Sequence, residues 1–163
     1  MDNTAHTHDT PDTPDTAGAP AEPRKVDQLL AHYGESHQNP RNELIHFIAI
    51  PLIMLSLVGM LFALHPYVAY AFVAASMVYY ARLSAVFFVS MALWSVLFMA
   101  LVFAMGPLVL PLSIAIFVGA WILQFIGHKI EGKKPSFFED IQYLWVGPLF
   151  VLSKLFGKLG IRW

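Results

Sequence analysis

Long apolar runs alternate with short polar breaks over most of the chain, and this pattern predicts a bundle of helices. Four apolar segments follow one another, at about 44–64, 67–81, 83–105 and 108–126. A helix that crosses a bilayer needs roughly 20 apolar residues, and three of the four reach or nearly reach that length. The second is shorter, although His65-Pro66 and Arg82 mark its limits clearly. We therefore expect an all-α integral membrane protein with about four transmembrane helices.

The polar sequence before the first apolar segment contains a helix and then a helix start. Apolar residues recur at helical spacing from Val26 to Tyr33, which predicts a short amphipathic helix over about 26–35. Asn39 followed by Pro40 is typical of a helix start, because Asn caps the first turn and Pro fits the first helical position. The next helix should begin near Pro40 and run directly into the apolar sequence.

The two ends of the chain differ from its middle. Residues 1–25 are polar and include the low-complexity run Asp9-Thr-Pro-Asp-Thr-Pro-Asp-Thr16, so we predict a disordered tail before a membrane-embedded domain over 26–163. A fifth apolar stretch, Ile141–Leu155, is interrupted by Gly147-Pro148 and is short for a span. Basic residues rim it, among them Lys154, which indicates an interfacial or re-entrant C-terminal segment.

Composition and charge support this topology. Hydrophobic residues make up 57% and charged residues 13% of the chain, about half the charged fraction of a typical soluble domain. Bases lie before the first segment, between the second and third (Arg82) and after the fourth, whereas the loops at His65-Pro66 and Gly106-Pro107 have none. The positive-inside rule then places both termini in the cytoplasm, with the bundle in the inner membrane if the source is bacterial. The chain has no cysteine, which excludes disulfides and thiolate metal sites.

Most histidines outside the tail fall on the cytoplasmic side of this arrangement. His37 precedes the first apolar segment, His46 lies just inside it, and His128 lies at the end of the fourth. Gln124 and Glu131 flank His128 at spacings of four and three residues, which place all three on one face of a helix. Ionisable groups at a membrane helix end are costly, and they usually face the bundle interior or water.

These residue types suit a divalent metal such as iron, zinc or manganese, so His37, His46, His128 and Glu131 are candidate ligands. Two histidines and a carboxylate with open positions suit non-haem Fe(II) and O₂ chemistry. Zinc would instead indicate hydrolysis by an activated water.

Simpler interpretations stand beside the metal site. Histidines near a membrane interface often hydrogen-bond only to lipid headgroups, water or a helix end. Glu131 has lysines nearby, such as Lys133, with which to pair. Asn42 is either a buried hydrogen-bond partner or part of the helix start, and Tyr33 either orients His37 or packs as an ordinary aromatic residue.

Two separated polar motifs frame the four apolar segments, and together they resemble a known family. The first is Tyr33-x-x-x-His37-x-Asn39-Pro40-x-Asn42-x-x-x-His46, and the second is Gln124-Phe-Ile-Gly-His128-x-x-Glu131-x-x-x-Pro135. Over about residues 26–156 the chain is similar to the small membrane family whose characterised fungal member is an endoplasmic-reticulum 2-hydroxy fatty acid dioxygenase.

The resemblance implies an Fe(II)-dependent dioxygenase of fatty acid α-oxidation, which shortens a 2-hydroxy acyl chain by one carbon with O₂ as oxidant. The implied iron ligands are His37, His46 and His128, with Glu131 as a further ligand or as a base beside the metal. The residues implied to orient the site or the substrate are Tyr33, Asn42 and Gln124.

Two other functions fit the same residues. The first is a haem-binding bundle in which His46 and His128 ligate the haem from either side. The second is a membrane scaffold or lipid-binding protein in which the histidines are incidental. The sequence has no glycine-rich phosphate loop, no nucleophile elbow and no nucleic-acid-binding module. The resemblance implies a 2-hydroxy fatty acid and O₂ as partners, and the apolar segments imply membrane lipids.

Overall fold

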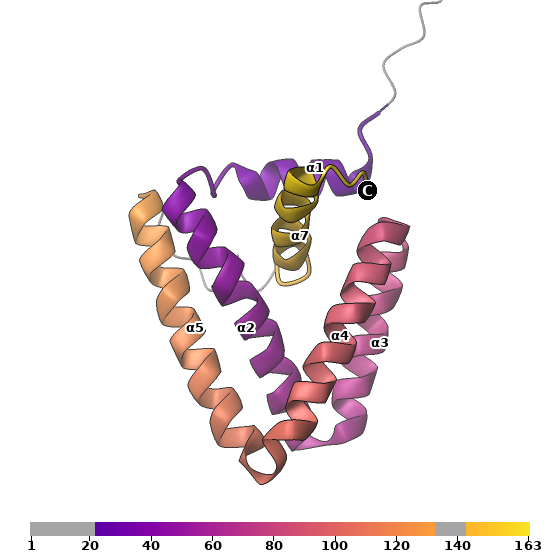
Figure 1. The fold of residues 1–163 in the computed structure, drawn as a ribbon, viewed down its shortest axis with the longest axis vertical. Helices are drawn as coiled ribbons and strands as arrows, with labels where there is room; N and C mark the ends of the chain where they lie inside the picture. Colours follow the sequence, from indigo (N-terminus) through magenta and orange to yellow (C-terminus); the bar gives the residue numbers. More distant parts are fainter. Residues whose placement is uncertain (1–21, 133–142) are drawn as a thin grey trace, which may run out of the picture.

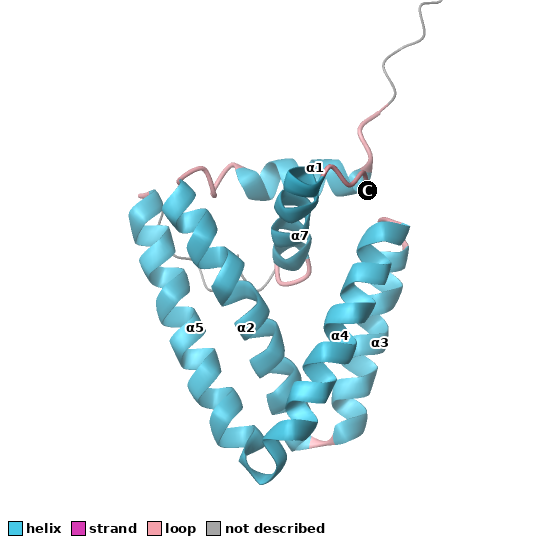
Figure 2. Cartoon of the chain, in the orientation of Figure 1, coloured by secondary structure: helices cyan, strands magenta, loops and turns pink. Residues whose placement is uncertain are grey.

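The computed structural model describes residues 22–132 and 143–163, and every regular element in these two ranges is a helix (Figure 2). The elements are α1 (Lys25–Gly34), α2 (Pro40–Leu64), α3 (Pro66–Ala81), α4 (Ala85–Met105), the single 3₁₀ turn η1 (Gly106–Leu108), α5 (Val109–Glu131) and α7 (Val146–Leu159). The all-α prediction is confirmed. The predicted disorder of the N-terminal tail and the part of the second motif that contains Pro135 lie outside the described residues.

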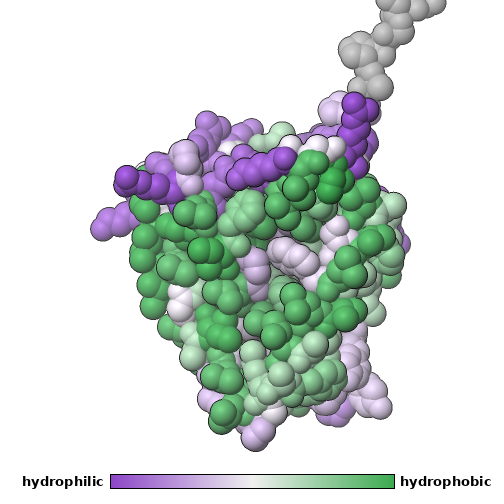
Figure 3. All heavy atoms as spheres, viewed as in Figure 1, coloured by the Kyte–Doolittle hydropathy of each residue, from purple (hydrophilic) through white to green (hydrophobic). Residues whose placement is uncertain are grey.

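The helices form two arms that converge at one end of the molecule and spread at the other (Figure 1). One arm is α2 with α5, which pack together more extensively than any other pair of described elements, and the other is α3 with α4. α1 lies across the open end, and α7 lies between the arms beneath it. The residues at this end are hydrophilic, whereas the sides in view are mostly hydrophobic (Figure 3).

The helix boundaries follow from local sequence signals. Asn39 is the N-cap of α2, and its Oδ1 accepts a hydrogen bond from the Arg41 N–H at 3.0 Å, so the predicted helix start at Pro40 is confirmed. His65 ends α2 and caps α3 in the same way, because its Nδ1 accepts from the Tyr67 N–H at 3.3 Å. Gly106 has a φ of +53°, a conformation that favours glycine, and there the chain turns back from α4 into α5.

The first two turns of the C-terminal helix α7 are buried in the bundle, whereas its last turn is exposed. Val146, Leu149 and Phe150 are each at most 3% exposed, and α7 packs against α1 and α2. The predicted interruption of the apolar stretch falls where α7 begins, because residues 143–145 form a turn and the helix starts at Val146. The Gly147-Pro148 pair lies in the first turn of α7, where the missing N–H of proline removes no intrahelical hydrogen bond, and the helix then continues to Leu159. This burial fits a helix inserted between the arms better than one lying on the interface.

Two stretches of the described residues, Pro40–Leu64 and Ala85–Glu131, are long and apolar enough to cross a membrane. The second contains both α4 and α5. Only 44% and 22% of their most apolar windows are buried within the molecule, so most of this apolar surface faces outward (Figure 3). Soluble monomers rarely expose apolar surface on this scale. Because α3 has 16 residues, fewer than a typical span, the four-span arrangement stays a prediction.

Candidate metal centre

His37 lies in the loop between α1 and α2 and is held by the end of α1. Its Nδ1 donates to the backbone oxygen of Tyr33 at 2.8 Å, and its ring stacks on the Tyr33 ring with centroids 4.2 Å apart and planes 9° apart. The spacing of four residues allows both contacts because the chain continues as a turn after α1, with the His37 N–H donating to the Gly34 oxygen at 3.1 Å. With the proton on Nδ1, the lone pair of a neutral imidazole is on Nε2, the atom available as a metal ligand.

His46 and His128 enter the site from the two helices of the α2–α5 arm. His46 is fully buried in the second turn of α2, and its Nδ1 donates to the backbone oxygen of Asn42 at 2.9 Å. Its tautomer is therefore the same as that of His37. His128 lies in the last turn of α5 and is 5% exposed. A backbone carbonyl that accepts from the other ring nitrogen is a usual partner of metal-binding histidines, because it fixes the tautomer and the ring orientation.

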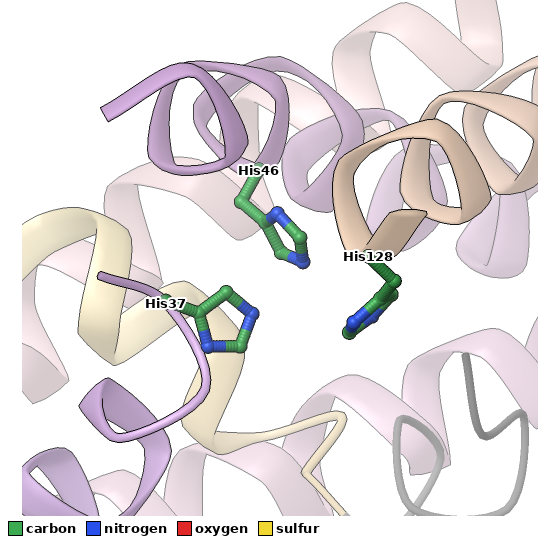
Figure 4. A group of neighbouring side chains, drawn as sticks. All are labelled: His37, His46 and His128. Carbon is green, nitrogen blue, oxygen red and sulfur yellow. The ribbon is translucent and has the colours of Figure 1, made fainter. Parts of the chain in front are cut away.

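The three imidazoles converge on one point (Figure 4). Each offers one nitrogen, and these three nitrogens lie within 4.8 Å of one another. The ring centroids are 4.2 Å apart for His37 and His46, 5.3 Å for His46 and His128, and 5.9 Å for His37 and His128. Metal–nitrogen bonds of about 2.1 Å place ligand nitrogens roughly 3–3.5 Å apart, so a small inward movement closes the group around one ion. These three residues fit a divalent metal ion that keeps other coordination positions open.

Glu131 lies at the end of α5 but outside this group of nitrogens, which among the described residues consists of the three histidines. Its carboxylate accepts from the backbone N–H of Gln38 at 2.9 Å, from that of Asn39 at 3.0 Å and from Nδ2 of Asn42 at 3.0 Å. These bonds tie the end of α5 to the loop that carries His37. The geometry thus favours a positioning role for Glu131 over that of a ligand.

Gly127 allows α5 to approach α2 closely enough for the histidines to meet. A Cβ atom at this position would lie 2.3 Å from Oδ1 of Asn42 and 3.4 Å from Cε1 of His46. Sequence reasoning did not assign Gly127 a role. The available signal was an isolated glycine inside a helical pattern, which often marks close packing.

Tyr33 and Gln124 line a hollow directly beneath the three histidines, which we call the histidine hollow. It is a small space of about 40 Å³, and the described residues that line it do not include the three histidines themselves. Ile50 of α2 and Gln124 of α5 are among the residues that line it. Ile50 lies one helical turn from His46, and Gln124 lies one turn from His128, in both cases away from the polar end of the molecule. Oε1 of Gln124 is buried and has no hydrogen-bond partner among the described residues. Of the three residues expected to orient the site or the substrate, Tyr33 and Gln124 line this hollow, and Asn42 does not.

The fold and site define a helical protein with three buried histidines at the polar end of an apolar bundle, placed so that they could hold a metal ion. The chain belongs to the 2-hydroxy-palmitic acid dioxygenase Mpo1-like family, whose model matches residues 24–159. It is 28% identical over 138 residues to the 2-hydroxy-palmitic acid dioxygenase MPO1 of Saccharomyces cerevisiae, covering 80% of this chain and 79% of that protein. No solved structure matches the chain. The family inferred from the two polar motifs is confirmed.

Proposed function

We propose that this protein is an Fe(II)-dependent dioxygenase that shortens 2-hydroxy fatty acids by one carbon. The observation that carries the proposal is the convergence of three buried imidazoles at the polar end of an apolar bundle. The family, and the yeast relative whose name states a dioxygenase of 2-hydroxy-palmitic acid, support the reaction class and the substrate class.

The proposed reaction breaks the bond between C1 and C2 of the substrate. C2 becomes the carboxyl carbon of the shorter acid, C1 leaves as carbon dioxide, and O₂ is fully reduced, with the remaining oxygen and hydrogens leaving as water. Fe(II), when bound, would supply the redox chemistry that makes O₂ reactive.

The protein side chains have separate roles in this proposal. His37, His46 and His128 hold the metal, and their burial keeps bulk water from the centre. Glu131 and Asn42 fix the loop before α2, so that Nε2 of His37 stays aimed at the other two rings. Tyr33 orients the His37 ring by stacking on it.

Gln124 has the position to bind the polar head of a substrate. Its amide lines the histidine hollow one turn below His128, and its oxygen is buried there. An amide offers both a donor and an acceptor, which match the carboxylate and the hydroxyl of a 2-hydroxy acid.

We further propose that the bundle is embedded in a membrane with both termini in the cytoplasm. The outward-facing apolar surface and the polar end with α1 support this orientation. A fatty acid then reaches the centre without leaving an apolar environment.

The observations support the two alternative functions, haem binding and a membrane scaffold, less well than the dioxygenase. Haem ligation requires a wide slot between two imidazoles, whereas the His37 ring lies against both His46 and His128. A scaffold with incidental histidines requires no convergence, whereas the three rings meet at one point and two share the same backbone-fixed tautomer.

The test compares detergent-purified wild type with His46→Ala and His128→Ala. Metal content is measured, and each protein is then loaded anaerobically with Fe(II) and assayed with O₂ and 2-hydroxypalmitate. We expect about one iron per wild-type chain, formation of the acid one carbon shorter, and loss of both in the variants. A wild type that holds no metal and stays inactive after Fe(II) addition would favour the scaffold, and a Soret band would favour haem.

A further inference from the structure

An open groove lies where the end of α7 meets the start of α2, and we call it the α2–α7 groove. Its volume is about 340 Å³, much more than that of the histidine hollow. The residues that line it are Pro40, Glu43, Leu44 and Phe47 of α2 and Lys158 of α7. Both helix ends lie at the open, polar end of the molecule, where α1 also lies (Figure 1). The groove is therefore at the level of the polar surface of the bundle.

The groove faces away from the candidate metal centre. Asn42 and His46 are fully buried and leave α2 on the side that packs against Gly127 of α5. Leu44 is 64% exposed and Ile48 is 52% exposed, so the groove side of α2 faces the surroundings. An occupant of the groove therefore contacts the outside of the bundle and not the three histidines.

The charged side chains around the groove leave it positive. The Glu43 carboxylate is neutralised by Lys154, whose Nζ lies 3.0 Å away. No described carboxylate pairs with Lys158, and its Nζ lies over the Phe47 ring, 5.7 Å from the centroid. Arg41 is also exposed and lies three residues before Leu44, one helical turn nearer the polar end. The charge of the groove therefore favours an anionic group at its polar rim.

The surface next to these charges is apolar toward the middle of the bundle. Leu44 and Ile48 lie one and two turns into α2, and Leu155, which is 40% exposed, lies one turn before Lys158 in α7. Because α2 begins and α7 ends at the polar end, all three lie deeper than the Lys158 ammonium. A molecule that matches this surface has an anionic head and an apolar tail.

The size of the groove favours a phospholipid over a fatty acid. Its volume of about 340 Å³ equals that of roughly ten molecules of liquid water. A phosphate with its glycerol groups occupies a space of this size, whereas a single carboxylate fills only a small part of it. Lysine and arginine at the edge of a membrane also attract anionic lipids.

We propose that the α2–α7 groove binds the head group of an anionic phospholipid, with the phosphate at Lys158. The acyl chains then run along the exposed apolar residues Leu44 and Ile48. The inference rests on the proposed embedding of the bundle in a membrane, and it does not depend on the dioxygenase reaction. Such a lipid contacts α2 and α7 at once, which distinguishes it from lipids that only surround the bundle.

The test titrates the detergent-purified full chain with dimyristoyl phosphatidylglycerol and dimyristoyl phosphatidylcholine, which share their acyl chains and differ in head-group charge. Native mass spectrometry gives the dissociation constant of the first bound molecule of each lipid. Lys158→Gln removes the positive charge, and Lys158→Arg keeps it. Leu44→Glu places a carboxylate in the groove, and Leu44→Gln is its neutral counterpart. Lys129→Gln is the matched control, because Lys129 is an exposed lysine in the last turn of α5 and does not line the groove.

We expect wild type to prefer phosphatidylglycerol and Lys158→Gln to lower that preference about five-fold, the effect of one basic residue at an anionic lipid surface. Leu44→Glu should lower it by at least as much, whereas the other three variants should keep the wild-type ratio. A wild type without preference, or a wild-type ratio in both Lys158→Gln and Leu44→Glu, would overturn the proposal. Displacement of the bound phosphatidylglycerol by an equal concentration of palmitate would overturn the choice of a phospholipid.

Flotation with phosphatidylcholine vesicles after an alkaline wash tests the membrane embedding separately. Protein that floats with the vesicles but shows no lipid preference in the titration refutes the groove and leaves the embedding intact. Protein that stays out of the vesicles refutes the embedding, while a preference that depends on Lys158 still supports the groove. Neither measurement requires iron or turnover of a 2-hydroxy acid.

Discussion

Glu131, the last residue of α5, accepts a hydrogen bond at 3.0 Å from the side chain of Asn42, which lies 89 residues earlier in α2. The same carboxylate holds the backbone of Gln38 and Asn39. The backbone oxygen of Asn42 in turn accepts from His46. One carboxylate thus links the loop of His37, the helix of His46 and the helix of His128.

This link predicts the effect of Glu131→Gln. The amide has one acceptor oxygen where the carboxylate has two, and its NH₂ group would face backbone N–H donors, so the His37 loop should loosen. We expect metal affinity to fall about 10–100-fold, the range found when outer hydrogen bonds to metal ligands are removed. The measurement is a competitive metal titration.

The control for that experiment is Glu43→Gln. Glu43 also lies near the start of α2, but its carboxylate pairs with Lys154 at 3.0 Å and is outside the metal centre. Its replacement should leave metal affinity near the wild-type value. Equal losses in both variants would mean that general negative charge, and not the bonds of Glu131, supports the site.

A pair of glycine substitutions in α5 tests the close approach of the two helices. Gly127→Ala would bring a methyl group against Asn42 and should destabilise the protein by about 1–3 kcal/mol, as overpacking typically does, while also weakening metal binding. Gly119 has nothing within 4 Å of the corresponding position, so Gly119→Ala should be neutral or stabilise by up to about 1 kcal/mol. Denaturant unfolding in detergent gives both values, and similar effects at the two positions would refute the argument.

Tyr33 should support His37 through its ring. Tyr33→Phe keeps the stacked contact, so its metal affinity should stay within about two-fold of wild type. Tyr33→Leu removes the contact, and the loss of about 0.5–1.5 kcal/mol corresponds to an affinity lower by about two- to ten-fold. If Tyr33→Phe instead matches Tyr33→Leu, the hydroxyl and not the ring is the important group.

Metal removal should lower the thermal stability. An ion that binds only the folded protein stabilises it by about 2.7 kcal/mol when its concentration is 100 times its dissociation constant. We therefore expect a higher melting temperature after Fe(II) or Mn(II) is added to chelator-treated wild type. His128→Ala should show no such rise, and an equal rise in that variant would place the ion elsewhere on the chain.

The helices could be predicted from the sequence because their signals are local. Asn39-Pro40 and His65-Pro66 start helices through a side-chain cap and a proline that needs no N–H donor. The candidate metal ligands could also be predicted from the sequence, because ionisable side chains are rare in and next to apolar segments. Local reasoning could not place the start of the last helix, because a Gly-Pro pair is compatible both with a break and with a first helical turn, and Gly147-Pro148 lies in the first turn.

By itself, the sequence determined the helical composition of this protein, most helix boundaries and the small set of polar residues from which the site is built. Only the tertiary structure decided that three histidines meet while Glu131 binds the neighbouring loop, and that Gly127 permits the meeting. The physical reason is that the alignment of α2 against α5 depends on side-chain packing between residues far apart in the chain, which no local pattern encodes.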